Sequence, residues 1–251
     1  MRKKVFFLVF LVVGAMLFPA EPEEIKSSDI DFTAALRFAF NRAKVEWSGG
    51  GGENELVYPY LALEVDADIL DFLTLGVVAG YNRNSFSGAV DFYRLPLSLR
   101  INEARNTSMV LGLNLQTEIV SFSDFVLKGK GEFLYFKLFK NEKTIALPVI
   151  EGQATIKNTF WELTVDLVLE YQGLTGANLF FGPRFNLIQG TLTVGEKIVG
   201  IDAEEEMKFK QKRWLDLVTG ISIDIGTSLE LKLTASFLSK TYLSAALCYA
   251  F

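Results

Sequence analysis

Apolar and polar residues alternate along most of this chain, and this alternation limits the available folds more than any other feature. Between Trp161 and Tyr171, every odd position is apolar or aromatic, while glutamate, threonine and aspartate fill most even positions. The same pattern recurs at 73–82 and 93–102. Because successive side chains of a β-strand point to opposite faces, each segment has one apolar and one polar face. The sequence therefore predicts an all-β fold.

About twelve such segments can be counted, and they predict the strands of a single sheet. They lie at 31–47, 56–66, 72–82, 90–101, 108–121, 131–140, 144–152, 160–171, 177–190, 213–225, 229–238 and 242–251. The segment at 144–152 is the weakest, so 10 strands remain the alternative to 12. In 31–47 the apolar phase changes near Arg42, which predicts a β-bulge there.

Charged residues recur on the polar face of these segments. The opposite face is nearly free of charge for about 9–10 residues at a time, the reach of a tilted membrane strand. Lipid offers no hydrogen-bond partners to the backbone, so only a closed ring of strands can span it. The polar face then lines a lumen. The charged candidates for that lining are Arg37, Glu64, Asp66, Arg94, Arg100, Glu118, Glu162, Asp166, Arg184, Asp216, Asp224, Glu230 and Lys232.

The connections between segments fall into two classes that alternate. Short ones, such as 67–71 and 226–228, follow longer ones, such as 83–89 and 191–212. This is typical of an antiparallel up-and-down membrane barrel with short periplasmic turns and longer extracellular loops. The connection at 191–212 carries several carboxylates, and we interpret it as a solvated loop rather than a calcium site.

The first residues predict export from the cytoplasm. Arg2, Lys3 and Lys4 precede a short apolar run, and small residues follow it, as in a secretory signal peptide. We therefore expect a signal peptide at 1–20, cleaved after Ala15 or Ala20. A short periplasmic segment at 21–30 and the barrel at 31–251 follow. The apolar run is shorter than the ~20 residues of a spanning helix, which disfavours an uncleaved anchor.

Two functions fit the predicted lumen. Acidic residues outnumber basic ones among the candidates, which favours a narrow porin-like channel for cations or small solutes. Alternatively, opposite charges pair and close the lumen, and the barrel serves as an anchor or surface-binding platform through its loops. Four bulky residues assigned to the inner face would help to block it: Phe133, Phe139, Phe180 and Trp214.

The chain contains no histidine, which argues against an enzyme. Histidine is the usual base near neutral pH, and most zinc and haem sites also require it. Carboxylate-only catalysis stays open, with the pairs Glu162/Asp166 and Glu64/Asp66 as candidates. Salt bridges from these carboxylates to arginines across the lumen are the favoured alternative. We expect no cofactor and no metal site, and the net charge of −5 argues against nucleic acid as a partner.

The last segment alternates apolar residues up to a final phenylalanine: Leu243, Ala245, Leu247, Tyr249 and Phe251. In this respect, and in its overall pattern, the chain resembles bacterial outer-membrane β-barrel proteins. The resemblance implies that these five residues form the signal read by the barrel-assembly machinery. It also implies location in the outer membrane, with lipid as a partner. The sequence leaves open whether barrels associate.

Overall fold

The computed structural model describes residues 30–48, 52–70, 72–87, 89–91, 100–102, 105–138, 141–146, 151–198 and 201–251. Its strands are β1 (Asp31–Trp47), β2 (Glu53–Val57), β3 (Tyr60–Leu70), β4 (Leu73–Ser87), β5 (Ala89–Asp91), β6 (Arg100–Asn102), β7 (Arg105–Phe122), β8 (Phe125–Leu138), β9 (Asn141–Ala146), β10 (Glu151–Leu174), β11 (Ala177–Ile198), β12 (Ile201–Gln211), β13 (Leu215–Ile225), β14 (Leu229–Phe237) and β15 (Lys240–Ala250). In this part of the chain, no helix is long and apolar enough to cross a membrane.

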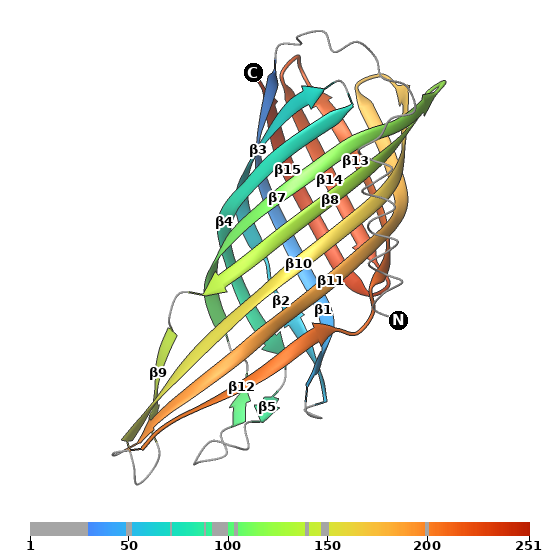
Figure 1. Cartoon of the computed structure of the whole chain (residues 1–251). Helices are drawn as coiled ribbons and strands as arrows, with labels where there is room; N and C mark the ends of the chain where they lie inside the picture. The colour runs from blue at the N-terminus through green and yellow to red at the C-terminus, as the bar shows by residue number, and fades with distance from the viewer. Residues whose placement is uncertain are drawn as a thin grey trace.

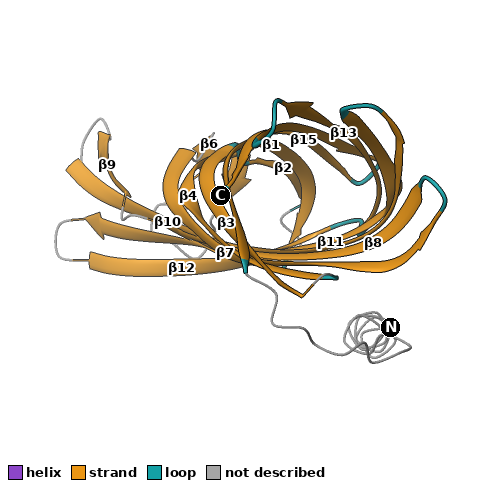
Figure 2. Cartoon of the chain, turned by 90° about the horizontal axis from the view of Figure 1, so that it is seen from above, coloured by secondary structure: helices purple, strands orange, loops and turns teal. Residues whose placement is uncertain are grey.

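Ten of the described strands pair in a closed antiparallel ring (Figures 1 and 2). The order is β1–β3–β4–β7–β8–β10–β11–β13–β14–β15, and β15 pairs again with β1. The predicted up-and-down barrel is confirmed. The sequence left about 12 or 10 strands open: ten close this ring, and β2, β9 and β12 join the same sheet outside it.

The described part of the barrel narrows toward one end. There β2 takes the place of β3 between β1 and β4, and β12 pairs with both β11 and the end of β1. Strands β13, β14 and β15 end before they reach this level. At the narrow end, β12 alone therefore takes the place of these three strands. The pairings at this level close through eight described strands, in the order β1–β2–β4–β7–β8–β10–β11–β12.

The two ends of the barrel differ in their connections. Four short turns, β3–β4, β7–β8, β10–β11 and β13–β14, lie at one end together with the start of β1 and the end of β15 (Figure 1). We call this the short-turn end; in outer-membrane barrels the end with short turns faces the periplasm. At the opposite loop end, β10 and β11 extend beyond the ring and form a projecting sheet with β9 and β12 (Figure 2).

Among the described residues, two of the predicted barrel strands do not take part in the ring. Within 90–101, the described residues form β5 and β6, which pair only with each other in a separate small sheet. Within 144–152, β9 pairs only with the projecting part of β10. In the described part of the chain, β4 instead pairs directly with β7, and β8 with β10. Alternation alone could not separate short strands outside the membrane from strands that cross it.

The predicted bulge near Arg42 is wrong, and so is the predicted loop at 191–212. Pairing of β1 with β15 runs without a register shift through Arg42 and Ala43. The apolar residues change from the outward to the inward face because β1 leaves the lipid there. Beyond that point the outward side chains become polar, while Val45 and Trp47 pack inside. Residues 191–212 are mainly a hairpin of β11 and β12. The outer face of this hairpin is charged because it also lies outside the lipid.

An apolar belt surrounds the ten-stranded part of the barrel. Leu63, Val77, Leu113 and Phe181 each expose more than half of their surface, and they lie on four different strands. Soluble monomers rarely expose continuous apolar patches of more than a few hundred Å². Aromatic residues also lie outward at the belt edges, including Tyr81 and Tyr249. A belt of this kind requires lipid around it.

Candidate functional site

The barrel interior is divided into an apolar core near the loop end and a polar cavity near the short-turn end. The apolar core includes Leu56, Tyr58, Phe86, Phe136, Ile156, Phe160, Ile188 and Leu192, each at most 2% exposed. Phe136 and Phe160 stack with ring centroids 4.2 Å apart, and Tyr58 packs edge-on against both rings at 5.5 and 5.3 Å. These side chains fill the interior across its width.

The apolar core lies where the barrel narrows. A ring of about eight strands encloses an interior just wide enough for side chains to fill. Replacement of β13–β15 by β12 therefore lets aromatic side chains from facing strands meet. Phe209 of β12 takes part directly, with its ring 5.3 Å from Trp47 and 5.2 Å from Phe86.

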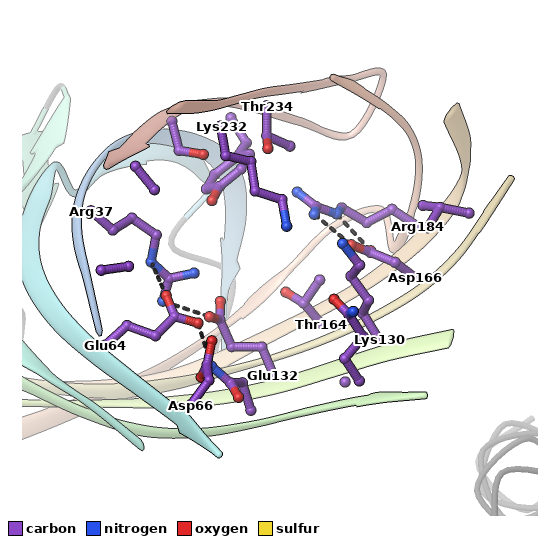
Figure 3. A pocket seen from close by; sticks show the side chains of 18 of the residues that line it. Arg37, Glu64, Asp66, Lys130, Glu132, Thr164, Asp166, Arg184, Lys232 and Thr234 are labelled. Carbon is purple, nitrogen blue, oxygen red and sulfur yellow. Dashed lines mark hydrogen bonds and ion pairs between the residues drawn. The ribbon is translucent and has the colours of Figure 1, made fainter. Parts of the chain in front are cut away.

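The polar cavity has a volume of about 160 Å³ and lies in the wider, ten-stranded part. Figure 3 shows its charged side chains pointing inward from strands on all sides. The charged residues that line it are Arg37, Glu64, Asp66, Lys130, Glu132, Glu162, Asp166, Arg184, Lys232 and Lys240. Seven of these ten were predicted from the sequence. Basic and acidic side chains are equal in number, so the lining is close to neutral.

Two arginines pair with carboxylates in this cavity (Figure 3). Arg37 contacts Glu132 at 2.6 Å and Glu64 at 3.4 Å, while Arg184 donates two hydrogen bonds to Asp166 at 2.7 and 2.6 Å. The predicted salt bridges to arginine are confirmed for Glu64 and Asp166, but they join neighbouring strands rather than opposite sides of the lumen. The Arg184–Asp166 pair is bidentate, and pairs of this kind are strong and fix the orientation of both partners.

A third polar group joins the cavity to the apolar core. Lys240, which is 4% exposed, donates a hydrogen bond to Glu162. Tyr58, a core residue, donates a second hydrogen bond to the other oxygen of Glu162 at 2.9 Å. Nearby, Asn114 donates to both Glu64 and Asp66. The candidate catalytic carboxylates are thus all engaged in hydrogen bonds or ion pairs.

Two lysines approach a single aromatic ring inside the cavity. The Nζ atoms of Lys130 and Lys232 lie 5.2 and 5.9 Å from the centre of the Phe180 ring. Phe180 is buried and faces inward, as the sequence predicted. Closer to the short-turn end, Lys128 pairs with Glu170 at 2.7 Å.

The remaining predicted lining residues lie elsewhere. Glu118 and Asp224 are exposed at the short-turn end, and Glu230 is half-buried outside the cavity lining. Asp216 is fully buried but accepts hydrogen bonds from Asn186 and from the backbone of Ser239 and Lys240. Arg100 belongs to β6, outside the barrel ring, and Arg94 lies outside the described residues.

The prediction missed Lys130 and Glu132 because it assigned β8 the wrong phase, and it missed Lys240 because it placed this residue in the connection before the last strand. Phe133, predicted to face inward, is exposed, and so is Trp214. Lys137, which the alternation also places on the polar, inward face of its strand, is exposed as well. Phe139 lies outside the described residues. Lys137 faces outward because it lies beyond the lipid-facing stretch of β8, where the outer face meets water. Reading this lysine as a lumen-facing residue reversed the two faces of the strand. An earlier start of the strand, at Phe125, would have indicated the correct phase.

The C-terminal strand closes the barrel. Leu243, Leu247 and Tyr249 are exposed on the apolar belt, and Ala245 shares their face at intermediate exposure. The backbone amide of Phe251 donates to the carbonyl of Phe32 at 3.0 Å, and their rings stack at 6.2 Å. The closing seam between β1 and β15 therefore extends to Phe251.

Comparisons with known proteins give structural similarity only. No protein-family model matches the chain, and no curated protein matches it. The translocator domain of the autotransporter NalP from Neisseria meningitidis has a TM-score of 0.47 and 11% identity, covering 99% of this chain and 97% of that one. The outer membrane protease OmpT from Escherichia coli has a TM-score of 0.46 and 9% identity, covering 92% and 99%. The outer membrane protein AlkL has a TM-score of 0.45 and 14% identity, covering 92% and 96%.

The class of the protein follows from its own structure. Its strands close without a free edge around the membrane zone, and an apolar belt faces outward there. The chain is a transmembrane β-barrel protein.

Proposed function

We propose that this protein is a closed barrel that anchors an extracellular sheet in the outer membrane, rather than an open channel. The observation that carries the proposal is the apolar core. Tyr58, Phe136 and Ile188 have no more than a trace of exposed surface, so water does not reach the middle of the lumen past them. Ions need a continuous hydrated path, which an aromatic core of this density removes.

The projecting sheet supports the platform part of the proposal. β10 has 24 residues and β11 has 22, whereas a membrane-crossing strand needs about 9–11. The excess of both strands lies at the loop end, where β9 and β12 widen the sheet (Figure 1). Its exposed residues on β12 alternate along one face and are charged, as suits a surface in water.

The carboxylate contacts favour a structural role over catalysis. Asp166 is held by Arg184, and Glu162 is held by Lys240 and Tyr58. A catalytic acid and base must be free to exchange protons with substrate. Carboxylates already paired with buried cations are poorly suited to that task.

Conductance in a planar lipid bilayer tests this proposal. We expect the correctly inserted wild-type protein to be silent. The variant Phe136→Ala with Phe160→Ala removes the stacked pair from the apolar core and should conduct. The matched control Phe133→Ala with Trp161→Ala removes an outward pair, with centroids 6.1 Å apart, from the same two strands. It should stay silent.

Stepwise openings of the wild-type protein would contradict the closed barrel. Correct folding is checked separately for every variant. Folded outer-membrane barrels resist detergent until heated, so migration on a gel should differ between unheated and boiled samples.

A further inference from the structure

A cleft opens on the outer wall of the barrel, where β12 replaces β13–β15. It has a volume of about 410 Å³ and lies between β1, the start of β2, the end of β12 and the β14–β15 turn. The change in strand number creates this cleft. The turn stops at Ser239, while the backbone of Lys212 continues past it and donates a hydrogen bond to the carbonyl of Lys44 at 3.0 Å.

Basic side chains dominate the cleft. Arg42, Lys44, Lys212 and Arg213 line it, against two carboxylates, Glu53 and Glu55. Arg42 Nε donates to Glu55 at 3.0 Å, and Lys212 pairs with Glu53. Lys44 and Arg213 have no ion pair within the described residues. The cleft therefore carries a net positive charge, although the chain as a whole carries −5.

The electrostatic field of the cleft lowers the pKa of Glu53, which lies outside the membrane zone. The hydrogen bond from Lys212 lowers the pKa of the Glu53 carboxyl below its usual value, and the charges of Lys44 and Arg213 lower it further. Several cations thus act on one point. An incoming anion would meet the same field.

The cleft lies at the outer edge of the apolar belt. Along β1 the outward side chains change from Phe38 and Phe40 to Arg42 and Lys44. On the other side, Leu238 is 65% exposed at the β14–β15 turn and has a φ of 119°, which leucine rarely adopts. Phe38, Phe40 and Leu238 thus form an apolar wall on the membrane side of the basic cleft.

The short-turn end carries the opposite charge. Its exposed charged residues in the described part of the chain are all acidic: Asp31, Asp68, Glu118, Asp124 and Asp224. The basic cleft is therefore a feature of the loop end, at the level of the outer-leaflet headgroups.

We propose that this cleft binds the phosphate of an anionic lipid in the outer leaflet, with the acyl chain along the wall below. Arginine and lysine together suit a phosphate, since guanidinium donates two parallel hydrogen bonds and ammonium adds charge. Basic pockets beside apolar surface are a recurrent means of binding lipid headgroups. This site does not depend on whether the lumen is closed.

Lipid selectivity measured with spin-labelled phosphatidic acid tests the proposal. The protein is reconstituted in phosphatidylcholine vesicles, and the association of labelled phosphatidic acid is compared with that of labelled phosphatidylcholine. The wild-type protein should prefer phosphatidic acid. Lys44→Gln with Arg213→Gln should reduce that preference by about tenfold, as expected for the loss of charge-assisted hydrogen bonds.

The matched control is Arg83→Gln with Lys137→Gln. These side chains are also exposed, one arginine and one lysine, at the loop-end edge of the belt on β4 and β8. The control should keep the wild-type preference. Equal loss in both variants would indicate diffuse surface charge and overturn the proposal, as would a wild-type protein with no preference.

Inorganic phosphate separates a lipid site from a site for the free ion. We expect millimolar phosphate to leave the lipid preference intact, because the apolar wall contributes to lipid binding. Loss of the preference in phosphate would overturn the lipid assignment. Each variant must first shift on heating in the gel assay, so that misfolding is not mistaken for lost binding.

Discussion

At the scale of single residues, the polar cavity depends on charges that satisfy one another. Asp166 and Arg184 are 5% and 7% exposed, and Arg184 also lies 4.8 Å above the ring of Tyr242. A buried ion pair gains little over an apolar pair of the same shape, but a single unpaired buried charge is costly. The pair therefore constrains which substitutions the cavity tolerates.

Asp166→Asn should destabilise the barrel by about 3–5 kcal/mol, since it keeps the volume but leaves the Arg184 charge without its partner. Urea unfolding in lipid vesicles, followed by tryptophan fluorescence, measures this change. Asp224→Asn is the control, because Asp224 is exposed at a turn and its loss should cost within about 0.5 kcal/mol. Equal stability of the two variants would contradict a buried ion pair.

The sequence predicted seven of the ten charged cavity residues because they alternate with lipid-facing residues on strands with a clear phase. It failed where a strand passes out of the lipid. There the outward face becomes polar and the inward face apolar, as with Lys44 and Val45. Apolar and polar residues still alternate there, but the apolar residues now face the interior and the polar residues face water. Lys137 and Phe133 were misassigned for this reason.

At the scale of elements, close approach between ring strands selects glycine at inward positions. A Cβ atom on Gly182 of β11 would lie 2.0 Å from the carbonyl oxygen of Leu167 on β10. A Cβ on Gly131 of β8 would meet nothing within 4 Å. Both glycines lie in regularly paired stretches of strand. They differ in the space available for a side chain and not in the regularity of the pairing.

Gly182→Ala should destabilise the barrel by about 1–3 kcal/mol, because backbone atoms must move apart to admit the methyl group. Gly131→Ala should be neutral or slightly stabilising, since alanine loses less backbone entropy on folding than glycine does. Both values come from the same urea titration. A Gly182→Ala variant as stable as Gly131→Ala would show that the strands do not approach this closely.

The C-terminal strand carries a prediction that geometry alone does not test. The resemblance to outer-membrane barrels implies that Phe251 is read during assembly. Phe251→Ser should therefore lower the fraction of folded, heat-modifiable protein in cell envelopes, while the purified variant still refolds in vesicles. Tyr81→Ser removes another exposed belt aromatic and should assemble normally. Failure of both variants to the same degree would contradict a special role for Phe251.

Element boundaries were less predictable than the fold class. Alternation and the rhythm of short turns predicted an up-and-down barrel, but short strands outside the membrane follow the same period. The small β5–β6 sheet and β9 were counted as crossing strands for this reason. The replacement of three strands by β12 depends on pairing between distant segments, which no local pattern records.

At the scale of the whole molecule, the change from ten strands to eight organises the protein. It leaves a polar cavity in the wider half and permits an apolar core in the narrower half. It also creates the basic cleft on the outer wall. Polar side chains thus line the wider part of the lumen, and apolar side chains fill the narrower part.

Cysteine accessibility tests this division most directly, in a protein whose native thiol is removed by Cys248→Ser. Thr234→Cys lines the polar cavity, whereas Ile188→Cys lies in the apolar core with 0% exposure. With a water-soluble maleimide, we predict rapid labelling of Thr234→Cys and almost none of Ile188→Cys until the barrel is unfolded. Labelling of Ile188→Cys as fast as Thr234→Cys would show a hydrated lumen and contradict the closed barrel.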